Sequence, residues 1–344
     1  MKTDAPPSAV AEAAPRRTTL TPQVPLLGAA AVLLLAACAA SLAVGAQHVP
    51  PGEVVRAFTG YTGSDAHLIV RDIRLPRTVL AVLVGAALGV AGALVQTLTR
   101  NPLAEPGILG VTAGSGFAIT LGAVFGIAGS QVVQFGLALV GAVLAAVAVQ
   151  TVGRTSPLRL VLAGTALSAV LAGISLGLRL VSPEVFDRYR YWQIGSLAGR
   201  ERLSTWLLMT VIVLALVGAL AVTRPLGALA LGEHVARTVG ARVTATKAAV
   251  LVLITVLAGA ATAAAGPIAF VGLMVPHLAR RLAGGSIPWL MAYTMLLGPV
   301  LVLVSDIGSR VLLPTGEVPV AIVTAFLGGP ALIWAVRRYG TVEP

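Results

Sequence analysis

The amino-acid sequence predicts an all-α, polytopic membrane protein with about ten transmembrane helices, and three observations carry that prediction. The 344-residue chain is 57% hydrophobic and only 11% charged, whereas a soluble domain carries roughly 25% charged residues. Its apolar residues gather into ten long segments whose centres hold no charged residue, and most segments reach the roughly 20 residues that a helix needs to cross a bilayer. The 38 glycines favour close packing of helices within a membrane.

The predicted spans are joined mostly by short connections. They are residues 25–46, 78–99, 107–128, 131–153, 158–180, 204–223, 247–265, 267–282, 287–309 and 317–336. The eighth span is short and contains Pro267 and Pro276, so we expect a broken or half helix there. Residues 247–282 can also be interpreted as one span followed by a re-entrant segment. Segments 101–106 and 266–270 both place proline and glycine beside a span, which a duplicated half or a coincidence explains equally well.

The chain is predicted to form a single transmembrane domain over residues 24–338, because no connection is long enough for a separate soluble domain. Residues 1–23 are predicted to be a flexible N-terminal tail, and residues 339–344 a short C-terminal tail. Both tails are expected in the cytoplasm, since basic residues favour the inner side and an even number of spans returns the chain there. The apolar segment after the first tail is too long for a signal-peptide core, so we expect it to remain as an anchor.

Several kinds of site are excluded by the motifs that the sequence lacks. A P-loop needs a Gly-Lys pair, and neither of the two lysines, Lys2 and Lys247, follows a glycine. The four histidines and Cys38 are scattered without metal-ligand spacing, and no His-Glu-x-x-His metalloprotease motif is present. We therefore expect no enzymatic activity, no metal site and no cofactor bound by this chain. The arginines lie between apolar spans, which favours lipid and protein partners over nucleic acid.

Segment 231–240 is predicted to be a short amphipathic helix on the inner side, outside the bilayer. Its apolar face is formed by residues at positions i, i+4 and i+8, namely Leu231, Val235 and Val239. Glu233 and Arg237 lie four residues apart and are expected to form an ion pair, and Gly240 is a typical C-terminal stop. Two interpretations remain open: the helix docks into a cytoplasmic motor protein, or it lies flat on lipid.

Three arginines are predicted at the outer ends of spans. Arg74 and Arg77 precede the second span, and Arg310 follows the ninth. A ring of guanidinium groups at an outer mouth can hold carboxylates of a delivering protein through bidentate pairs. The alternative is that these side chains only reach from the span to the membrane surface.

A set of ordered motifs resembles one known family. The motifs are Arg74-Leu75-Pro76-Arg77, Gly85 to Gly92 with Gln96, Asn101-Pro102-Leu103-Ala104-Glu105-Pro106-Gly107-Ile108-Leu109-Gly110, Leu162-Ala163-Gly164, Leu231-Gly232-Glu233 with Ala236-Arg237, Gly266-Pro267-Ile268-Ala269-Phe270-Val271-Gly272-Leu273, Pro276-His277-Leu278-Ala279-Arg280, Asp306 with Arg310, Glu317-Val318-Pro319-Val320 and Leu327-Gly328-Gly329-Pro330. Together, over roughly residues 25–338, they resemble the FecCD-type permeases. These are the membrane subunits of binding-protein-dependent ABC importers for iron–siderophore complexes, haem and vitamin B12.

The resemblance implies a ten-helix, type II importer-like bundle in a bacterial cytoplasmic membrane. It implies a second permease subunit, identical or paralogous, with the passage at the interface of the two. It also implies two ATPase subunits that bind ATP and Mg²⁺, and an external substrate-binding protein.

The resemblance further assigns residue roles. Arg74, Arg77 and Arg310 match positions that form salt bridges to glutamates of the binding protein. Residues from about 229 to 241 match a coupling helix that fits a cleft of the ATPase; the residues assigned to it are Leu231, Gly232, Glu233, His234, Val235, Ala236, Arg237, Val239 and Gly240. The inner constriction, or gate, matches the turn between spans four and five, with Thr155, Ser156, Pro157 and Leu158. In the vitamin B12 relative this turn is richer in hydroxyl groups, so the turn does not favour vitamin B12 as the cargo.

The expected function is that of a permease subunit of an ATP-driven importer, with ferric siderophores as cargo. The main alternative is a proton-coupled secondary transporter of a small solute. That mechanism needs an ionisable group in mid-membrane, and the acids nearest the spans, Glu105, Asp306 and Glu317, are expected at their edges. A membrane-embedded enzyme would need a polar catalytic pair within the bundle, and a purely scaffolding protein would not need the motifs above.

Overall fold

The computed structural model describes residues 23–153, 157–199, 205–313 and 316–339, and every regular element within them is a helix. In chain order they are α1 (Gln23–Ala43), α2 (Pro51–Thr59), α3 (Asp65–Leu68), the π-helical turn η1 (Ile69–Arg74), α4 (Leu75–Thr99), the 3₁₀ turn η2 (Pro106–Leu109), α5 (Val111–Val124), α6 (Gln131–Gly153), α7 (Pro157–Val181), α8 (Pro183–Gln193), α9 (Thr205–Ala221), α10 (Thr223–Ala230), α11 (Glu233–Thr238), α12 (Val243–Ala265), α13 (Val271–Ala283), α14 (Ile287–Val311) and α15 (Val320–Tyr339). The predicted all-α class is confirmed.

Each predicted span coincides with one helix: α1, α4, α5, α6, α7, α9, α12, α13, α14 or α15. Six helices of the described chain are long and apolar enough to cross a membrane. A seventh span results if α9 and α10, which meet at a 52° bend, are counted as one. The third predicted span, 107–128, contains a helix of only 14 residues, α5. It is shorter than predicted because residues 106–109 form a separate turn, and Gly110 then takes a positive φ of 72° before α5 begins.

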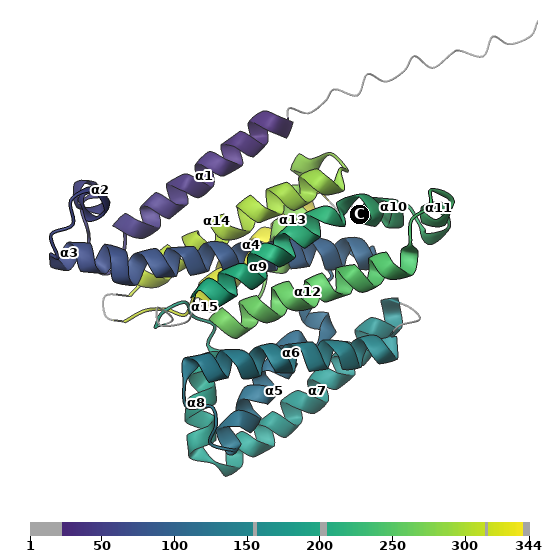
Figure 1. Cartoon of the computed structure of the whole chain (residues 1–344), viewed down its shortest axis with the longest axis horizontal. Helices are drawn as coiled ribbons and strands as arrows, with labels where there is room; N and C mark the ends of the chain where they lie inside the picture. Colours follow the sequence, from purple (N-terminus) through teal and green to yellow (C-terminus); the bar gives the residue numbers. More distant parts are fainter. Residues whose placement is uncertain (1–22, 154–156, 200–204, 314–315, 340–344) are drawn as a thin grey trace, which may run out of the picture.

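Helix α4 lies at the centre of the bundle (Figure 1). It packs against α14, α12, α13 and α9. In the continuous helical stretch Asp65–Thr99, 89% of the most apolar 18-residue window is buried within the protein. The corresponding window of α1 is only 17% buried. The other helices therefore shield α4 from lipid, whereas α1 lies at the periphery.

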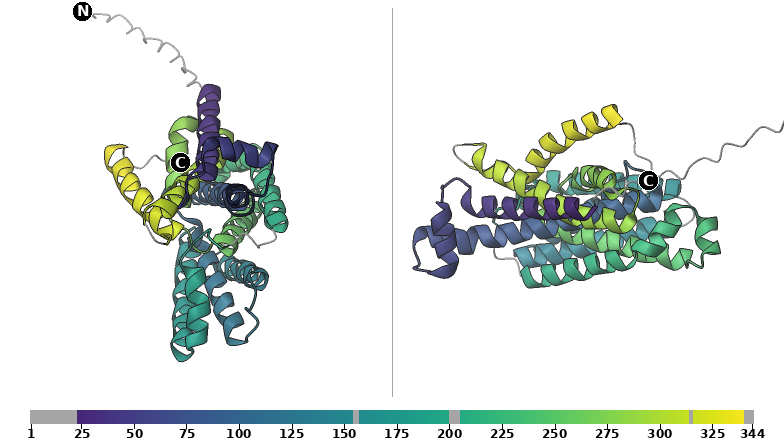
Figure 2. Two further views of the ribbon diagram at one scale, coloured as in Figure 1. Left: turned by 90° about the vertical axis from the view of Figure 1, so that its left-hand side faces the viewer. Right: turned by 90° about the horizontal axis from the view of Figure 1, so that it is seen from above.

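Helices α5 to α8 form a second group on the side of the bundle opposite α1 (Figure 2). Within this group α5 packs against α6, α7 and α8. Helix α12 contacts both α4 and α6, so it joins the two groups. Helix α15 packs against α14 and α13 and completes the chain at the edge of the bundle.

Close contacts between glycines hold α4 against its neighbours. A β carbon on Gly85 would lie 2.6 Å from the carbonyl oxygen of Gly298 on α14, and one on Gly92 would overlap the backbone of Gly272 on α13. Larger residues at these crossings would force the helices apart. The glycine content predicted from the sequence to allow close packing serves that purpose here.

The eighth predicted span is a half helix, as expected. Helix α12 ends at Gly266, whose φ is 78°, and α13 starts only after Phe270, whose φ of 69° is rare for a non-glycine residue. The side-chain amide of Gln96 on α4 donates hydrogen bonds to the carbonyl oxygens of Gly272 and Leu273 at 3.2 and 3.3 Å. These bonds satisfy two of the backbone groups near the interrupted segment.

The two proline- and glycine-containing segments meet at this break. The Glu105 carboxyl is hydrogen-bonded by the backbone of Phe270. A β carbon on Gly272 would lie 3.0 Å from Cδ of Pro106. Glu105 therefore lies against the start of α13.

Candidate functional sites at the two ends of the bundle

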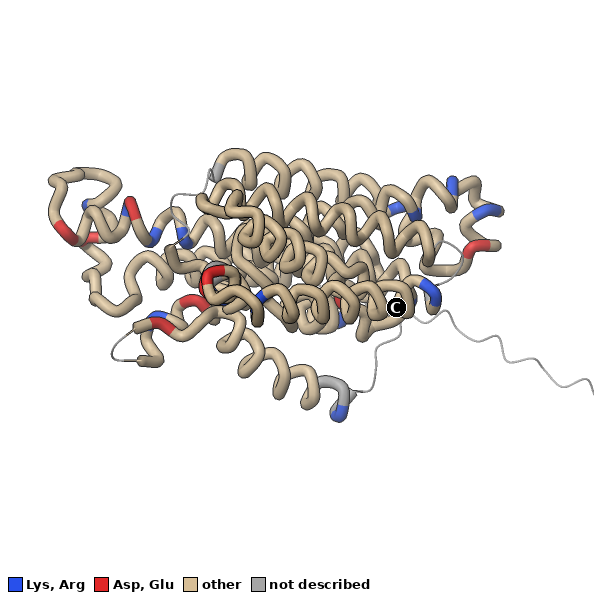
Figure 3. The backbone as a smooth tube through the Cα atoms, turned by 90° about the horizontal axis from the view of Figure 1, so that it is seen from below, with Lys and Arg blue, Asp and Glu red and all other residues tan. Residues whose placement is uncertain are grey.

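Charged residues of the described chain lie mainly at the two ends of the bundle (Figure 3). We call the end that carries α2 and α3 the outer end, and the end that carries α10 and α11 the inner end. The outer end holds the three predicted docking arginines, and the inner end holds the predicted coupling helix. Both ends were assigned functions from the sequence, so their geometry is described in turn.

Arg77, in the first turn of α4, is held by two carboxylates. Its Nη2 lies 2.8 Å from Oδ1 of Asp306 on α14 and 2.8 Å from Oε2 of Glu317, which precedes α15. Its Nη2 also donates to the hydroxyl of Ser309 at 3.4 Å. Asp306 is fully buried, so a single arginine joins α4, α14 and the start of α15.

Arg310 shares the same carboxylate and reaches α1. Its Nη2 lies 2.8 Å from Oδ2 of Asp306 and donates to the Ser41 hydroxyl at 2.8 Å. Its Nη1 donates to the carbonyl oxygens of Ser41 and Val44 at 3.0 and 3.1 Å. These carbonyls lie at the C-terminal end of α1, which has no following turn to satisfy them, so Arg310 acts as a cap for that helix.

Arg74 completes the cluster by donating to the carbonyl oxygens of Leu42 and Gln47. The structure thus brings the three predicted docking arginines together at the outer end. Their exposed fractions are only 4% for Arg74, 5% for Arg77 and 4% for Arg310. Each guanidinium group faces the interior of the protein and has partners there, which the sequence did not indicate.

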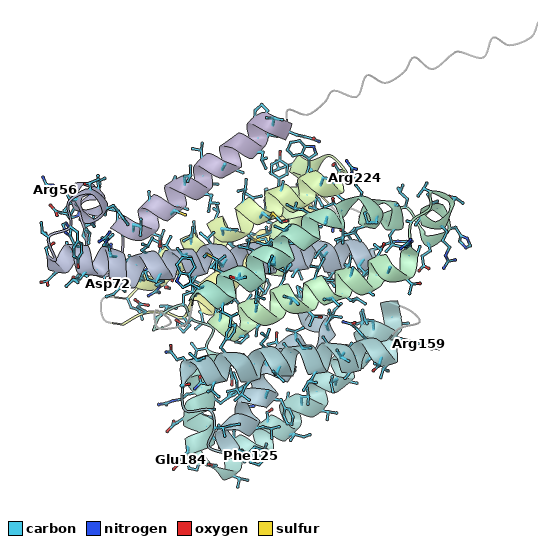
Figure 4. The ribbon with its side chains drawn as sticks, viewed as in Figure 1. Arg56, Asp72, Phe125, Arg159, Glu184 and Arg224 are labelled. Carbon is cyan, nitrogen blue, oxygen red and sulfur yellow. The ribbon has the colours of Figure 1, made fainter. Side chains whose placement is uncertain are left out.

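Two other arginines at the outer end are exposed. Arg56 of α2 pairs with Glu53 at 2.8 Å and is 71% exposed. Arg71 lies with its guanidinium carbon 4.8 Å from the ring centroid of Tyr61. Figure 4 labels Arg56 on α2, at this end of the bundle. The docking residues predicted from the sequence include neither of these two arginines.

At the inner end, α11 lies between two glycines with positive φ, Gly232 at 121° and Gly240 at 79°. The predicted ion pair is present, with Nη2 of Arg237 3.3 Å from Oε2 of Glu233. Ala236 is fully buried, so one side of the helix packs on the bundle. The predicted apolar face points outward: Leu231, Val235 and Val239 are 74%, 43% and 67% exposed. His234 is also exposed.

Glu233 has a second partner, which the sequence did not reveal. The ammonium group of Lys247, on α12, forms an ion pair with the Glu233 carboxylate. This hydrogen bond lowers the pKa of the Glu233 carboxyl below its ordinary value, and the nearby charges of Arg237 and Arg100 act in the same direction. The pair fastens α11 to α12 across a turn of the chain. Arg100 also donates to the carbonyl oxygen of Leu229 at 3.0 Å, which ties α4 to α10.

The predicted gate lies partly outside the described residues, since Thr155 and Ser156 are not among them. Pro157 is the first residue of α7, and Leu158 is 68% exposed. A β carbon on Gly153 would lie 2.6 Å from Cα of Leu160, so α6 and α7 approach closely at this turn.

A shallow cavity lies on α8 at the outer end. It measures about 210 Å³ and is lined by Phe186, Tyr189, Arg190, Gln193 and Ile194. Arg179 of α7 lies with its guanidinium carbon 3.9 Å from the ring centroid of Tyr189. Ligand pockets that enclose a drug-sized molecule measure roughly 300–1,000 Å³, so this cavity does not enclose a large cargo by itself.

A helical bundle of this kind, with a buried charge cluster at one end and a projecting amphipathic helix at the other, defines a membrane permease. The chain belongs to the FecCD transport family, whose model matches residues 33–338. It is a non-catalytic transmembrane subunit of an ABC importer.

Relatives in two bacteria support the assignment. The chain is 48% identical over 313 residues to the ferric enterobactin transport system permease protein FepD of Escherichia coli, which covers 89% of this chain and 93% of that protein. It is 38% identical to the probable siderophore transport system permease protein YfiZ of Bacillus subtilis, over 89% of this chain and 93% of the relative.

A solved structure shares the fold. It is described as an inward-facing conformation of a metal-chelate type ABC transporter, and it aligns with a TM-score of 0.80 at 28% identity. The alignment covers 92% of this chain and 99% of that one. The predicted type II importer-like bundle is confirmed.

Proposed function

We propose that this permease carries ferric siderophores across the bacterial cytoplasmic membrane, driven by ATP hydrolysis on partner subunits. The observation that carries the proposal is the match to FepD, at 48% identity over nearly the whole of both chains. The name of that relative specifies ferric enterobactin, and the name of YfiZ specifies a siderophore. Ferric siderophores are therefore the cargo class that the relatives favour over haem or vitamin B12.

The passage is proposed to form between this chain and a second permease subunit, identical or paralogous. Membership of the FecCD transport family supports this, and a metal chelate needs a wide route. A pair of chains can build that route from facing surfaces. The turn from Thr155 to Leu158 is proposed as its inner gate on the basis of the family resemblance.

Helix α11 is proposed to dock into the ATPase subunits, which bind ATP and Mg²⁺. Its exposed apolar face, Leu231, Val235 and Val239, supports this role, because an amphipathic helix commonly binds in an apolar groove of a partner. The Glu233–Lys247 ion pair supports transmission of movement, since it connects α11 to the long helix α12. On this proposal the inner end and both chain termini lie in the cytoplasm.

The external binding protein is proposed to dock at the outer end. Direct pairing of Arg74, Arg77 and Arg310 with its glutamates stays a prediction, and it requires side chains that are now 4–5% exposed to leave their internal partners. Arg56 and Arg71 are accessible without any rearrangement. We propose that these two make the first contacts, and that the buried cluster fixes the helix ends beneath them.

The proton-coupled alternative finds little support among the described acids. Asp306 is buried, but it is paired with both Arg77 and Arg310. Glu105 is hydrogen-bonded at the start of α13.

Reconstitution of the chain with its ATPase and binding protein in sealed vesicles tests the proposal. Radiolabelled ferric enterobactin should accumulate when ATP is supplied on the ATPase side, and a protonophore should not reduce the uptake. Uptake that follows an imposed proton gradient without ATP would instead establish the secondary-transporter mechanism.

A further inference from the structure

The inner end of α13 contains two basic side chains that are buried and have no partner in the described chain. His277 is 1% exposed and Arg280 is 9% exposed. Both ring nitrogens of His277 and both terminal nitrogens of Arg280 lack a hydrogen-bond partner there. Buried charged groups are normally paired, because removing an unpaired charge from water is costly. The unpaired guanidinium group of Arg280, with the unpartnered His277 ring one helical turn away, therefore indicates a missing anionic group.

The described acids do not supply that group. On the inner half of the bundle they are Glu105 and Glu233. Glu233 is paired with Lys247 and Arg237. Glu105 contacts Phe270 at the opposite end of α13, about 15 Å from Arg280 by the rise of a helix. The C-terminal end of α13 adds a partial negative charge of roughly half a unit, but it provides no acceptor aimed at the guanidinium group.

The start of α1, the end of α13 and the first turns of α14 lie together at the inner end. The Gln23 side chain donates to the carbonyl oxygen of Ala283 at 3.2 Å, and the Tyr293 hydroxyl donates to the Gln23 carbonyl at 2.8 Å. Trp289 packs on Tyr293 with ring centroids 6.2 Å apart. Tyrosine and tryptophan concentrate at the headgroup level of a bilayer, so these two side chains favour a headgroup level near the end of α13.

We infer that His277 and Arg280 bind the phosphate of an anionic lipid headgroup between α13 and its neighbours. A guanidinium group matches a phosphate with two parallel hydrogen bonds, and an imidazole adds another donor. Basic pockets between transmembrane helices on the cytoplasmic side are known binding places for such headgroups. The inference does not depend on the cargo or on the partner proteins.

Thermal unfolding of the full chain in nanodiscs tests the inference. Replacing part of a phosphatidylcholine bilayer by phosphatidylglycerol should raise the Tm of the wild type and leave that of Arg280→Gln unchanged. In phosphatidylcholine alone, Arg280→Gln should unfold at a higher temperature than the wild type, because the unpaired charge is gone. The matched control is Arg224→Gln on α10, which removes an exposed inner-end charge (Figure 4) and should respond to the anionic lipid as the wild type does.

Two further measurements distinguish a lipid phosphate from soluble phosphate as the bound anion. They are native mass spectrometry of lipid binding and thermal unfolding with added inorganic phosphate. Arg280→Gln should retain phosphatidylglycerol with about fivefold lower affinity, the loss expected for one arginine–headgroup contact. Inorganic phosphate in phosphatidylcholine discs should not change the Tm; if it reproduces the effect, the ligand is soluble phosphate and the lipid assignment is wrong. An equal response of wild type and Arg280→Gln to the anionic lipid also overturns it. If Arg280→Gln does not fold, His277→Gln is used, with the same expected loss of response in smaller degree.

Discussion

Arg77 of α4 and Asp306 of α14 form a buried ion pair, with Nη2 and Oδ1 2.8 Å apart. The two residues are 229 positions apart in the sequence. The Asp306 side chain is fully buried and its second oxygen is taken by Arg310. The carboxylate thus compensates two guanidinium groups at once. The pair fixes how α4 and α14 meet at the outer end, where the binding protein is proposed to dock.

Removal of one member of this pair should destabilise the fold strongly. Asp306→Asn leaves the positive charges of Arg77 and Arg310 buried without the carboxylate that balances them. Breaking a buried pair in this way costs roughly 3–5 kcal/mol. The measurement is the free energy of unfolding in mixed detergent micelles. The control is Asp187→Asn, whose exposed pair with Arg190 should contribute almost nothing because solvent screens it. Equal stability of the two variants would contradict a structural role for Asp306.

Docking of the binding protein should depend on the exposed arginines. Arg56→Glu combined with Arg71→Glu should weaken binding most at low salt, because interactions between exposed charges are screened as ionic strength rises. The measurement is the Kd of the binding protein for the permease in nanodiscs at two salt concentrations. Arg74→Glu with Arg77→Glu is the comparison: if that variant folds normally and alone loses binding, the buried arginines are the docking residues.

Charge reversal in α11 should uncouple ATP hydrolysis from transport. Glu233→Arg places a third positive charge beside Lys247 and Arg237, so the connection between α11 and α12 is lost. We expect a folded complex with weak substrate-stimulated ATPase activity and little uptake. Thr238→Ala, on the same short helix, is the control. Full stimulation in Glu233→Arg would show that α11 does not couple the two activities.

The Glu233–Lys247 pair should also make the inner end sensitive to low pH. The pKa of Glu233 is lowered in the folded protein, so the pair contributes stability above the unfolded value of about 4.3. That contribution should disappear as the pH falls below the unfolded pKa and passes through the lower pKa that Glu233 has in the folded protein. Hydrogen exchange of α11 measures it: protection should fall below about pH 4.3 in the wild type, whereas Lys247→Met should already show lower protection at neutral pH. Identical exchange profiles would exclude the pair as the fastening of α11.

The crossing of α4 and α13 should not tolerate a side chain. A β carbon at Gly92 would overlap the Gly272 backbone, so Gly92→Leu should cost more than about 3 kcal/mol or prevent folding. Gly173→Leu is the matched control, because Gly173 lies within a long apolar helix and has no atom near its β position. The measurement is the yield of monodisperse protein together with its Tm. A Gly92 variant as stable as the control would mean that the two helices do not cross here.

The sequence alone predicted a helix within each of the ten apolar segments, but not the helices α2, α8 and α10 in the connections between them. In lipid every backbone group must be satisfied within its own segment or by neighbours, so uninterrupted apolar runs specify helices locally. The break after Gly266 followed in the same way from glycine and proline. The Glu233–Arg237 pair was also predictable, since residues four apart on a helix are neighbours.

Tertiary structure decided which polar side chains meet. The burial of Arg74, Arg77 and Arg310, the attachment of Glu233 to Lys247, and the isolation of Arg280 all depend on how distant helices pack. A sequence pattern reports the distance between residues along one helix, but not the rotation and depth of that helix against the others. Those two quantities are fixed by close contacts such as Gly92 with Gly272, and they determine whether an arginine faces a partner protein, an internal carboxylate or neither.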